Sequence, residues 1–423
     1  MYIDLFPPRK MSVEVSLPSS KSISNRALVI YALATGKKLD DGSVDMLLRN
    51  LSDCDDTRVM RRALTMMPER IDIMAAGTAM RFLTAYLAVT EGTHIITGTE
   101  RMRHRPIGIL VDALRTLGAE IEYVGQEGFP PLKVTGKTLT HHVLDMPANV
   151  SSQYISALMM IGPYVQGGLT LRLGDVVASR PYICMTKSIM ETFGAQVEWT
   201  ADNIIKVAQE EYRVVPYYVE SDWSASSYWF QMVALSGDSD AEVLLPGLFA
   251  ESLQGDSVVK ALFDSLGVNA EFVTSNGGTE TLRLTHKDIS CGQLNLDMSG
   301  CPDLAQTLVV TSAMLGVSFR LSGLHSLRIK ETDRMEALER ELEKLGFVIH
   351  DEADDILYWD GERSASQTQF AIDTYDDHRM AMCMAPVALK TGHVRINDPE
   401  VVSKSYPGYW DDLEKAGFKI EKS

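Results

Sequence analysis

The sequence lacks a long apolar run and an excess of basic residues, two features that mark large classes of protein. No apolar run approaches the roughly 18–20 residues that cross a bilayer. The start, Met1–Pro8, has no apolar signal core after a basic segment, so we expect neither a membrane span nor export. The formal charge is −17. General nucleic-acid binding is therefore not expected, because a phosphate backbone requires a basic face.

Cysteine is scarce and scattered. The chain has five cysteines and no C-x-x-C pair, which argues against a zinc site or a disulfide framework and favours a reducing cytoplasm. The chain also lacks the G-x-x-x-x-G-K-[ST] and G-x-G-x-x-G loops, which counts against a nucleotide-dependent phosphotransferase. The cysteines are Cys54, Cys184, Cys291, Cys301 and Cys383.

What the chain does contain is an internal repeat. Its 423 residues suggest two domains. A helical apolar pattern that ends in a glycine and is followed by a short strand recurs at roughly 70–80 residues. A sixth copy, 56–67, lacks the glycine. The other copies are 110–118, 189–194, 258–267, 335–346 and 410–417.

A second type of helix alternates with the first. Each copy begins in a polar loop, becomes apolar and stops near a glycine, which is the usual residue after a helix end. A strand follows most of them, so the sequence predicts an α/β protein of six helix–strand–helix–strand units, three in each domain. These helices are predicted over 20–36, 77–92, 151–167, 224–237, 303–316 and 377–392.

The polar loops before these helices gather basic residues although the chain is acidic. Helix N-termini carry unpaired N–H groups and a partial positive charge, so three equivalent helices per domain should present an anion-binding face. The loops are Pro18–Arg26, Gly77–Arg81, Arg101–Pro106, Ser151–Tyr154, Ser179–Tyr182, Pro302–Asp303, Arg328–Arg334, Tyr375–Met382 and Val402–Pro407.

Eight strings within these loops resemble the signature segments of the 3-phosphoshikimate 1-carboxyvinyltransferases, or 5-enolpyruvylshikimate-3-phosphate synthases. They occur in family order and are SKSISNRA, AGTAMR, RMRHRPIG, SSQY, SRPY, RIKETDR, DHRMAM and DP-x₄-K-S-Y-P. The resemblance implies two inverted, inside-out α/β barrels with the active site in the interdomain cleft. It implies an N-terminal domain over 20–219, on the shikimate 3-phosphate side. Residues 1–19 plus 220–423 would form the C-terminal domain, on the phosphoenolpyruvate and acid/base side, and would include the first strand.

The resemblance also implies the ligand-binding residues. Those expected at shikimate 3-phosphate are Lys21, Ser22, Arg26, Ser151, Ser152, Gln153, Ser179, Asp303 and Lys330. Those expected at phosphoenolpyruvate are Lys21, Gly77, Arg105, Gln153, Arg334, Arg379 and Lys404. We expect Arg26 to bind the ring carboxylate, because an arginine fork matches a carboxylate in a bidentate manner.

The implied reaction transfers the enolpyruvyl group of phosphoenolpyruvate to the 5-hydroxyl of shikimate 3-phosphate by addition and elimination. It needs two proton carriers. The resemblance assigns Asp303 as the base and makes Glu331 the natural second carboxylate. Lys21 and Lys330 could stabilise charge or share protons, and the proton path stays open. No metal or organic cofactor is expected, since phosphoenolpyruvate carries its own leaving group.

Other interpretations of these residues are kept open. Asp303 could cap the helix that follows it, as well as react. Glu331 and Arg334 could form a surface pair at i, i+3. The chain could instead be a UDP-N-acetylglucosamine 1-carboxyvinyltransferase or a non-catalytic anion-binding relative. We expect a cytoplasmic monomer with small-molecule substrates and with no nucleic-acid or membrane partner. The segment 36–75 is shorter than usual in the family, so the first repeat should be trimmed.

Overall fold

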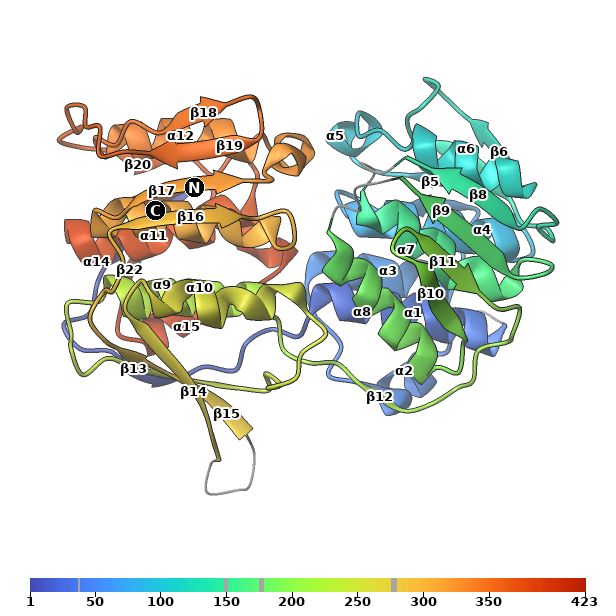
Figure 1. Ribbon diagram of the computed structural model, residues 1–423, viewed down its shortest axis with the longest axis horizontal. Coiled ribbons are helices and arrows are strands. Elements are labelled where there is room, and N and C mark those ends of the chain that lie inside the picture. Colours follow the sequence, from blue (N-terminus) through green and yellow to red (C-terminus); the bar gives the residue numbers. More distant parts are fainter. Residues whose placement is uncertain (37–38, 148–150, 175–178, 275–279) are drawn as a thin grey trace. The chain divides into compact units, whose positions relative to one another are not determined.

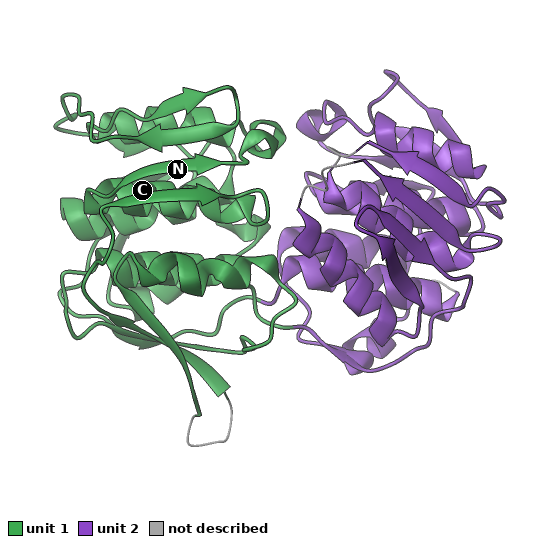
Figure 2. Ribbon diagram, viewed as in Figure 1, with its two compact units in different colours: residues 1–18, 220–423 green, residues 19–219 purple. Residues whose placement is uncertain are grey.

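The computed structural model describes residues 1–36, 39–147, 151–174, 179–274 and 280–423. The chain divides into two compact units (Figure 2). Unit 1 is Met1–Pro18 with Glu220–Ser423, and unit 2 is Ser19–Val219. The first crossing therefore lies one residue before the boundary expected from the sequence. Within the described ranges, no helix is long and apolar enough to cross a membrane.

Each unit contains three central helices that are buried on nearly all faces. Because apolar residues lie on every side of these helices, the helices are buried and pack on one another. All six belong to the series that the sequence predicts to start in polar loops. In unit 2 they are α1 (Lys21–Thr35), α4 (Gly77–Val89) and α7 (Ser152–Ile161), and in unit 1 α9 (Trp223–Leu235), α11 (Ala305–Leu315) and α13 (His378–Met384) (Figure 1).

The other helix series is present as well and is exposed on one side. The five glycines predicted to end these helices have φ angles between 83° and 106°, a region that only glycine adopts without strain. In the sixth copy, Met67 takes this position with φ 45°. The helices are α3 (Asp55–Met66), α6 (Gly108–Leu117), α8 (Arg180–Thr192), α10 (Val259–Asp264), α12 (Arg334–Lys344) and α15 (Tyr409–Lys415).

Short helices and 3₁₀ turns complete the helical structure. Pro386 interrupts the last central helix, which continues as η5 and α14, because proline has no backbone N–H to donate. The short elements are α2 (Asp41–Leu47), α5 (Glu100–Arg103), α14 (Ala388–Thr391), η1 (Gly162–Tyr164), η2 (Gly255–Val258), η3 (Pro302–Leu304), η4 (His325–Ile329), η5 (Ala385–Val387) and η6 (Pro399–Lys404).

Five four-stranded sheets within the described residues share one pattern, in which a parallel pair is followed by two antiparallel neighbours. Figure 1 shows, for example, β13, β14 and β15 running side by side. The sheets of unit 2 are β4 (Arg70–Asp72)–β5 (Thr93–Thr97)–β7 (Leu132–Thr135)–β6 (Glu120–Tyr123) and β8 (Val143–Met146)–β9 (Leu169–Leu173)–β11 (Ile204–Val207)–β10 (Val197–Ala201). Two sheets of unit 1 are β2 (Ser12–Glu14)–β13 (Glu242–Pro246)–β15 (Glu280–His286)–β14 (Val268–Thr274) and β16 (Gln293–Asp297)–β17 (Ser318–Ser322)–β19 (Ile356–Trp359)–β18 (His350–Glu352).

The first strand of the chain completes the last sheet of unit 1. This sheet has the order β20 (Ala371–Ile372)–β21 (Val394–Asn397)–β1 (Tyr2–Phe6)–β22 (Lys419–Lys422). The backbones of Tyr2 and Ser423 exchange two hydrogen bonds of 3.1 Å, so both ends of the chain are held in one sheet. The first strand of the chain thus lies in the same unit as the C-terminal half of the sequence.

Two strands lie just before the points where the chain crosses between the units, and each pairs within its own unit. β2 precedes α1 in the sequence but pairs in parallel with β13 of unit 1. β12 (Tyr217–Tyr218) precedes α9 but pairs in parallel with β3 (Leu48–Arg49) of unit 2. Among the described residues of the first repeat, this parallel pair is the part of the common pattern that is present, as expected from the shortened sequence. The helix–strand repeats of the two-domain α/β fold are confirmed, and the helices rather than a closed sheet occupy the centre of each unit.

Glu220 is the first residue of unit 1 after the second crossing, and its carboxylate is buried. It accepts hydrogen bonds from Trp223 Nε1 at 2.6 Å, the Phe249 N–H at 2.8 Å, the Ser252 hydroxyl at 2.7 Å and Gln254 Nε2 at 2.9 Å. Burial raises the pKa of Glu220 despite these bonds. One carboxylate therefore satisfies four donors that burial has removed from water.

We predict that Glu220→Gln lowers the stability of unit 1. The amide NH₂ faces donors, so at least one buried donor loses its acceptor, at a cost of about 2 kcal/mol. For a unit of this size, that cost corresponds to a fall in Tm of roughly 4–8 °C. Thermal unfolding of Glu220→Gln measures it, with Glu271→Gln, at an exposed position of β14, as the control. Equal Tm values for the two variants would contradict the prediction.

Candidate active site

In unit 1 the N-terminal ends of the central helices converge on one cluster of charges. Asp303, in the turn η3 before α11, lies at its centre. Its Oδ1 accepts from Arg334 Nη1 at 2.9 Å and lies 3.5 Å from Lys330 Nζ, and its Oδ2 accepts from Arg379 Nη2 at 3.2 Å. The structure thus brings together five of the residues predicted from the sequence, Glu331 being the fifth.

The environment of Asp303 holds it in the ionised form. Burial alone would raise its pKa, but Arg379, Lys330 and Arg334 lower the pKa to well below its usual range. The interpretation of Asp303 as a helix cap is wrong. Its carboxylate makes no capping bond to α11 among the described residues, because three cations occupy it instead.

Arg334 links three carboxylates from three elements and is itself only 1% exposed. Its Nε donates to Asp377 Oδ2 at 2.7 Å and its Nη2 donates to Glu331 Oε2 at 2.8 Å, beside the bond to Asp303. Burial opposes the charge on Arg334, and Asp377, Glu331 and Asp303 more than offset it, so its pKa is raised. The Glu331–Arg334 contact exists, but its arginine is buried, so the surface-pair interpretation is wrong.

Arg379 stands in the first turn of α13, where Asp377 is the N-cap and accepts from the Arg379 N–H at 2.8 Å. Its Nη1 lies 3.4 Å from both the Tyr228 hydroxyl and the Asp303 carbonyl oxygen. Lys404, at the end of η6, donates its ammonium to the carbonyl of Asp376. Tyr375 and Asp376 both have positive φ, which costs energy for residues with side chains. This strained pair leads the chain directly into Asp377 and Arg379.

Unit 2 contains a buried cation with a different surrounding. The Arg26 guanidinium donates to Thr186 Oγ1 at 2.6 Å, Ser156 Oγ at 3.2 Å and the Ser22 carbonyl at 2.8 Å. Burial lowers its pKa to about 10, so it is still charged near neutral pH. Among the described residues no carboxylate pairs with Arg26. A buried charge with only neutral partners is costly, and a bound anion would offset that cost.

Gly77 opens α4 and lets two arginines approach its backbone. A methyl group on Gly77 would lie 2.6 Å from Nη1 of Arg105 and 2.8 Å from Nη1 of Arg81. Arg81 Nη1 donates to the Gly77 carbonyl at 2.9 Å. In the described part of the chain, the buried Nε of Arg105 has no hydrogen-bond partner and Arg105 forms no ion pair. Two adjacent guanidiniums at a helix start suit an anion.

The start of α7 supplies further donors in unit 2. Ser151 is the N-cap and accepts from the Gln153 N–H at 3.3 Å, while Ser152 is buried in the first turn. Gln153 Nε2 donates to Thr78 Oγ1 at 3.3 Å, which brings the starts of α7 and α4 together. The hydroxyl of Tyr154 donates to the Pro106 carbonyl at 2.7 Å and so fixes the loop that carries Arg105.

The remaining predicted residues, Lys21, Ser22 and Ser179, also belong to unit 2, but the contacts described here do not join them into one cluster. Lys21, the first residue of α1, has its ammonium 3.2 Å from Asp56 Oδ2 of α3. Ser22 is half-buried beside it. Ser179 precedes α8 with φ 52° and makes no capping bond to α8 within the described ranges.

Several residues of these clusters were not predicted from the sequence. Asp377, Tyr228 and Ser156 lie at or near helix starts, but their partners are far away in the chain. The predicted helix over 377–392 already placed Asp377 at a helix start, where an aspartate is a usual N-cap. Asp56 and Thr186 carry no comparable signal, because their contacts with Lys21 and Arg26 join helices that are separate in the sequence.

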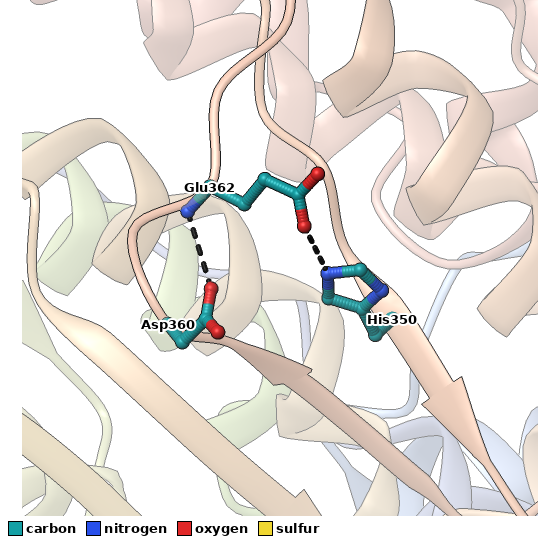
Figure 3. A group of neighbouring side chains, drawn as sticks. All are labelled: His350, Asp360 and Glu362. Atoms are coloured by element: carbon teal, nitrogen blue, oxygen red, sulfur yellow. Dashed lines mark hydrogen bonds and ion pairs between the residues drawn. The ribbon is translucent and has the colours of Figure 1, made fainter.

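A separate group of possible metal ligands comprises His350 of β18 and Asp360 and Glu362 of the turn after β19 (Figure 3). It is the one such group among the described residues, and its ligand atoms lie within 4.8 Å of one another. His350 Nε2 lies 2.9 Å from Glu362 Oε2, and Asp360 Oδ1 accepts from the Glu362 N–H at 3.2 Å. These residues are largely open to water and bond to each other, so their arrangement does not by itself indicate a metal site.

We predict that Asp303→Asn changes how stability depends on pH. A carboxyl whose folded pKa is lowered stabilises the fold above its unfolded pKa of about 4, and loses that contribution as the pH falls below this value. The stability difference between the wild type and Asp303→Asn should shrink by up to about 1.4 kcal/mol for each pH unit below about 4. Urea unfolding across this range measures it. The exposed Asp240→Asn is the control, and a difference independent of pH would contradict the prediction.

Comparisons with known proteins identify the family of the chain. A sequence model of EPSP synthase (3-phosphoshikimate 1-carboxyvinyltransferase) matches residues 66–413. A 3-phosphoshikimate 1-carboxyvinyltransferase of Bacteroides fragilis is 55% identical over 418 residues, covering 99% of this chain and 98% of the relative. One of Vibrio cholerae is 36% identical over 437 residues, covering 97% and 98%.

Solved structures share the fold. An EPSP synthase from Acinetobacter baumannii aligns over 100% of both chains with a TM-score of 0.76 and 20% identity. The enolpyruvyl transferase NikO from Streptomyces tendae aligns over 100% of this chain and 98% of its own, with a TM-score of 0.71 and 16% identity. At such identities the likeness concerns the fold alone. With the family model matching most of its length and close relatives covering nearly all of it, the chain belongs to the EPSP synthase family.

Proposed function

We propose that this chain transfers the enolpyruvyl group of phosphoenolpyruvate to the 5-hydroxyl of shikimate 3-phosphate, releasing inorganic phosphate. The observation that carries the proposal is the cluster of Asp303, Lys330, Glu331, Arg334 and Arg379, which places two carboxylates among three cations. The 55% identity to a 3-phosphoshikimate 1-carboxyvinyltransferase over the whole chain supports the same activity. The reaction belongs to the shikimate pathway towards chorismate and the aromatic amino acids.

For shikimate 3-phosphate, we assign the residues at the helix starts of unit 2. Arg26 is a buried fork whose described partners are all neutral, which suits the ring carboxylate. The hydroxyls and amide of Ser151, Ser152, Ser179 and Gln153 suit the phosphate dianion. Lys21, Ser22, Asp303 and Lys330 complete the assignment.

For phosphoenolpyruvate, the assignment uses cations of both units. Unit 2 provides Lys21, Gly77, Arg105 and Gln153, and the unpaired Nε of Arg105 supports a ligand there. Unit 1 provides Arg334, Arg379 and Lys404. The meeting of the two sets in one cleft stays a prediction.

The chemistry needs a proton at the methylene carbon of phosphoenolpyruvate and removal of the proton from the 5-hydroxyl. The hydroxyl oxygen attacks C2. The adduct then loses phosphate from C2 and a proton from its methyl group, which restores the vinyl group. Asp303 is ionised and therefore able to accept the hydroxyl proton. Glu331, whose Oε2 accepts from Arg334, is the second carboxylate, and Lys21 and Lys330 stabilise the charge that develops.

The related assignment to UDP-N-acetylglucosamine has less support, because the matching family and the close relatives named above are shikimate enzymes. A monomer in the cytoplasm belongs to the same proposal. All five cysteines lie within the described ranges and are free thiols, as a reducing compartment requires.

The direct test is an assay of phosphate release. The purified chain mixed with shikimate 3-phosphate and phosphoenolpyruvate should release inorganic phosphate and form 5-enolpyruvylshikimate 3-phosphate, without added metal. Omission of shikimate 3-phosphate is the control and should leave phosphoenolpyruvate intact. Phosphate release with UDP-N-acetylglucosamine as the sole effective acceptor would replace this proposal, and release with neither acceptor would favour the non-catalytic relative.

Lys21→Ala tests the assignment of Lys21. Loss of one charged group that contacts the reacting ligand typically costs about 10²–10³-fold in kcat, so we expect turnover to fall by at least that much. The Tm should stay near that of the wild type, because removal of a cation that opposes the helix dipole offsets the loss of its ion pair with Asp56. Lys187→Ala, which removes an exposed pair with Glu191 on α8, is the matched control. A collapse of Tm in Lys21→Ala would make Lys21 structural.

A further inference from the structure

Asp256 is a buried carboxyl group that the proposed reaction does not use. It lies in η2 and is only 3% exposed. Its Oδ2 accepts a hydrogen bond from the Ser224 hydroxyl, whereas its buried Oδ1 has no hydrogen-bond partner among the described residues. A native carboxylate oxygen rarely lies buried without a partner, since its desolvation is not repaid.

The one described partner of Asp256 leads along α9 to the cluster around Asp303. Ser224 lies in the first turn of α9, and Tyr228 follows one turn later on the same face. The Tyr228 hydroxyl accepts from Arg379 Nη1 at 3.4 Å, and Arg379 Nη2 donates to Asp303. Between them, the Ser227 hydroxyl bonds to Thr307 Oγ1 at 3.2 Å and joins α9 to α11. Asp256 therefore bonds to the first turn of α9, the helix whose Tyr228 hydroxyl accepts a hydrogen bond from Arg379.

The charges around Asp256 come from every neighbouring element. Burial, and after it the charge of Asp303, raises the pKa of Asp256 to about 6. The Ser224 bond and Arg379 act in the opposite direction, and Asp222, the N-cap of α9, adds to the increase. Cys301 also lies in this field, with a pKa raised chiefly by burial. From α10, the Lys260 ammonium lies over the Trp223 ring at 5.3 Å.

We propose that Asp256 is a positioning residue that takes up a proton when phosphoenolpyruvate binds at Arg379, so that its negative charge does not oppose the anion. The inference rests on the proposed function, which assigns Arg379 to phosphoenolpyruvate. The proton comes from the buffer and returns to it when the ligand leaves, and no covalent bond to carbon or phosphorus changes at Asp256. Asp256 acts through Arg379 and Tyr228 and does not touch the reacting atoms.

The sign of the effect follows from linkage. A second anion near Asp256 favours its neutral form, so binding is tightest where Asp256 is already protonated and weakens as the pH rises through about 6. A shift of one pKa unit on binding corresponds to a tenfold change in affinity. Asparagine at this position has the same shape and stays neutral. The affinity of the variant for phosphoenolpyruvate should therefore not be weakened by a charge at this position at any pH.

The experiment compares the KM for phosphoenolpyruvate, at saturating shikimate 3-phosphate, between about pH 5 and pH 8. The ratio of the wild-type KM to that of Asp256→Asn should be about one at the acid end and rise to about tenfold at the alkaline end. The titration of phosphoenolpyruvate itself acts equally on both enzymes and cancels in the ratio. Asp412→Asn is the matched control, since Asp412 is buried in the same unit and accepts from the Tyr406 hydroxyl; its ratio should be independent of pH.

A flat ratio for an active Asp256→Asn enzyme would overturn the inference and leave Asp256 a structural residue. Absence of wild-type turnover would refute the proposed function instead, so the two failures are distinct. If Asp256→Asn does not fold, Ser224→Ala provides the second test. It removes the bond that favours the carboxylate, so the midpoint of the KM dependence should move to higher pH; an unchanged midpoint would overturn the inference.

Discussion

The buried guanidinium of Arg334 is the interaction on which the cluster in unit 1 depends. It takes Asp303, Glu331 and Asp377 from separate elements and holds all three within hydrogen-bonding distance. A buried ion pair of this kind adds little net stability, but losing one member leaves uncompensated charge, so the arrangement is strongly specified. The positions of Asp303 and Arg379 follow from this network, and with them the proposed acid–base chemistry.

The cations of the two units differ in whether carboxylates already pair with them. In unit 2, Arg26 contacts hydroxyls and carbonyls, and Arg105 lies beside Gly77 without an ion pair in the described residues, so the positive potential is not neutralised. In unit 1, every arginine of the cluster already has a carboxylate partner. Under the proposed function, phosphoenolpyruvate at unit 1 would share these cations with Asp303 and Glu331. Two carboxylates would then lie beside the ligand, where proton transfer needs them, and the charge of Asp256 would affect binding.

The repeat architecture explains why the sites form at helix starts. Central helices without a polar face have to be buried, and their polar N-terminal loops remain as the part that water or ligands reach. At the crossings, β2 pairs in parallel with β13 and β12 pairs in parallel with β3, so each strand that precedes a crossing joins a sheet of its own unit. In the shortened first repeat, Met67 adopts the conformation that glycine adopts in the other copies, which shows that the position in the repeat, and not the residue type, imposes the turn.

The sequence alone determined the elements, their order and the class of ligand. Apolar periodicity and the glycines that end helices are local patterns, set by residues close together in the sequence. The two helix series and strands such as β5 and β9 could therefore be predicted from the sequence. Tertiary structure alone decided which charges meet. The partners of several residues lie far away in the chain, as for Asp377, Tyr228, Thr186 and Asp256. Asp303 contacts three cations and does not cap a helix among the described residues. Such choices depend on burial and on the charges of packed neighbours, and no local pattern encodes either.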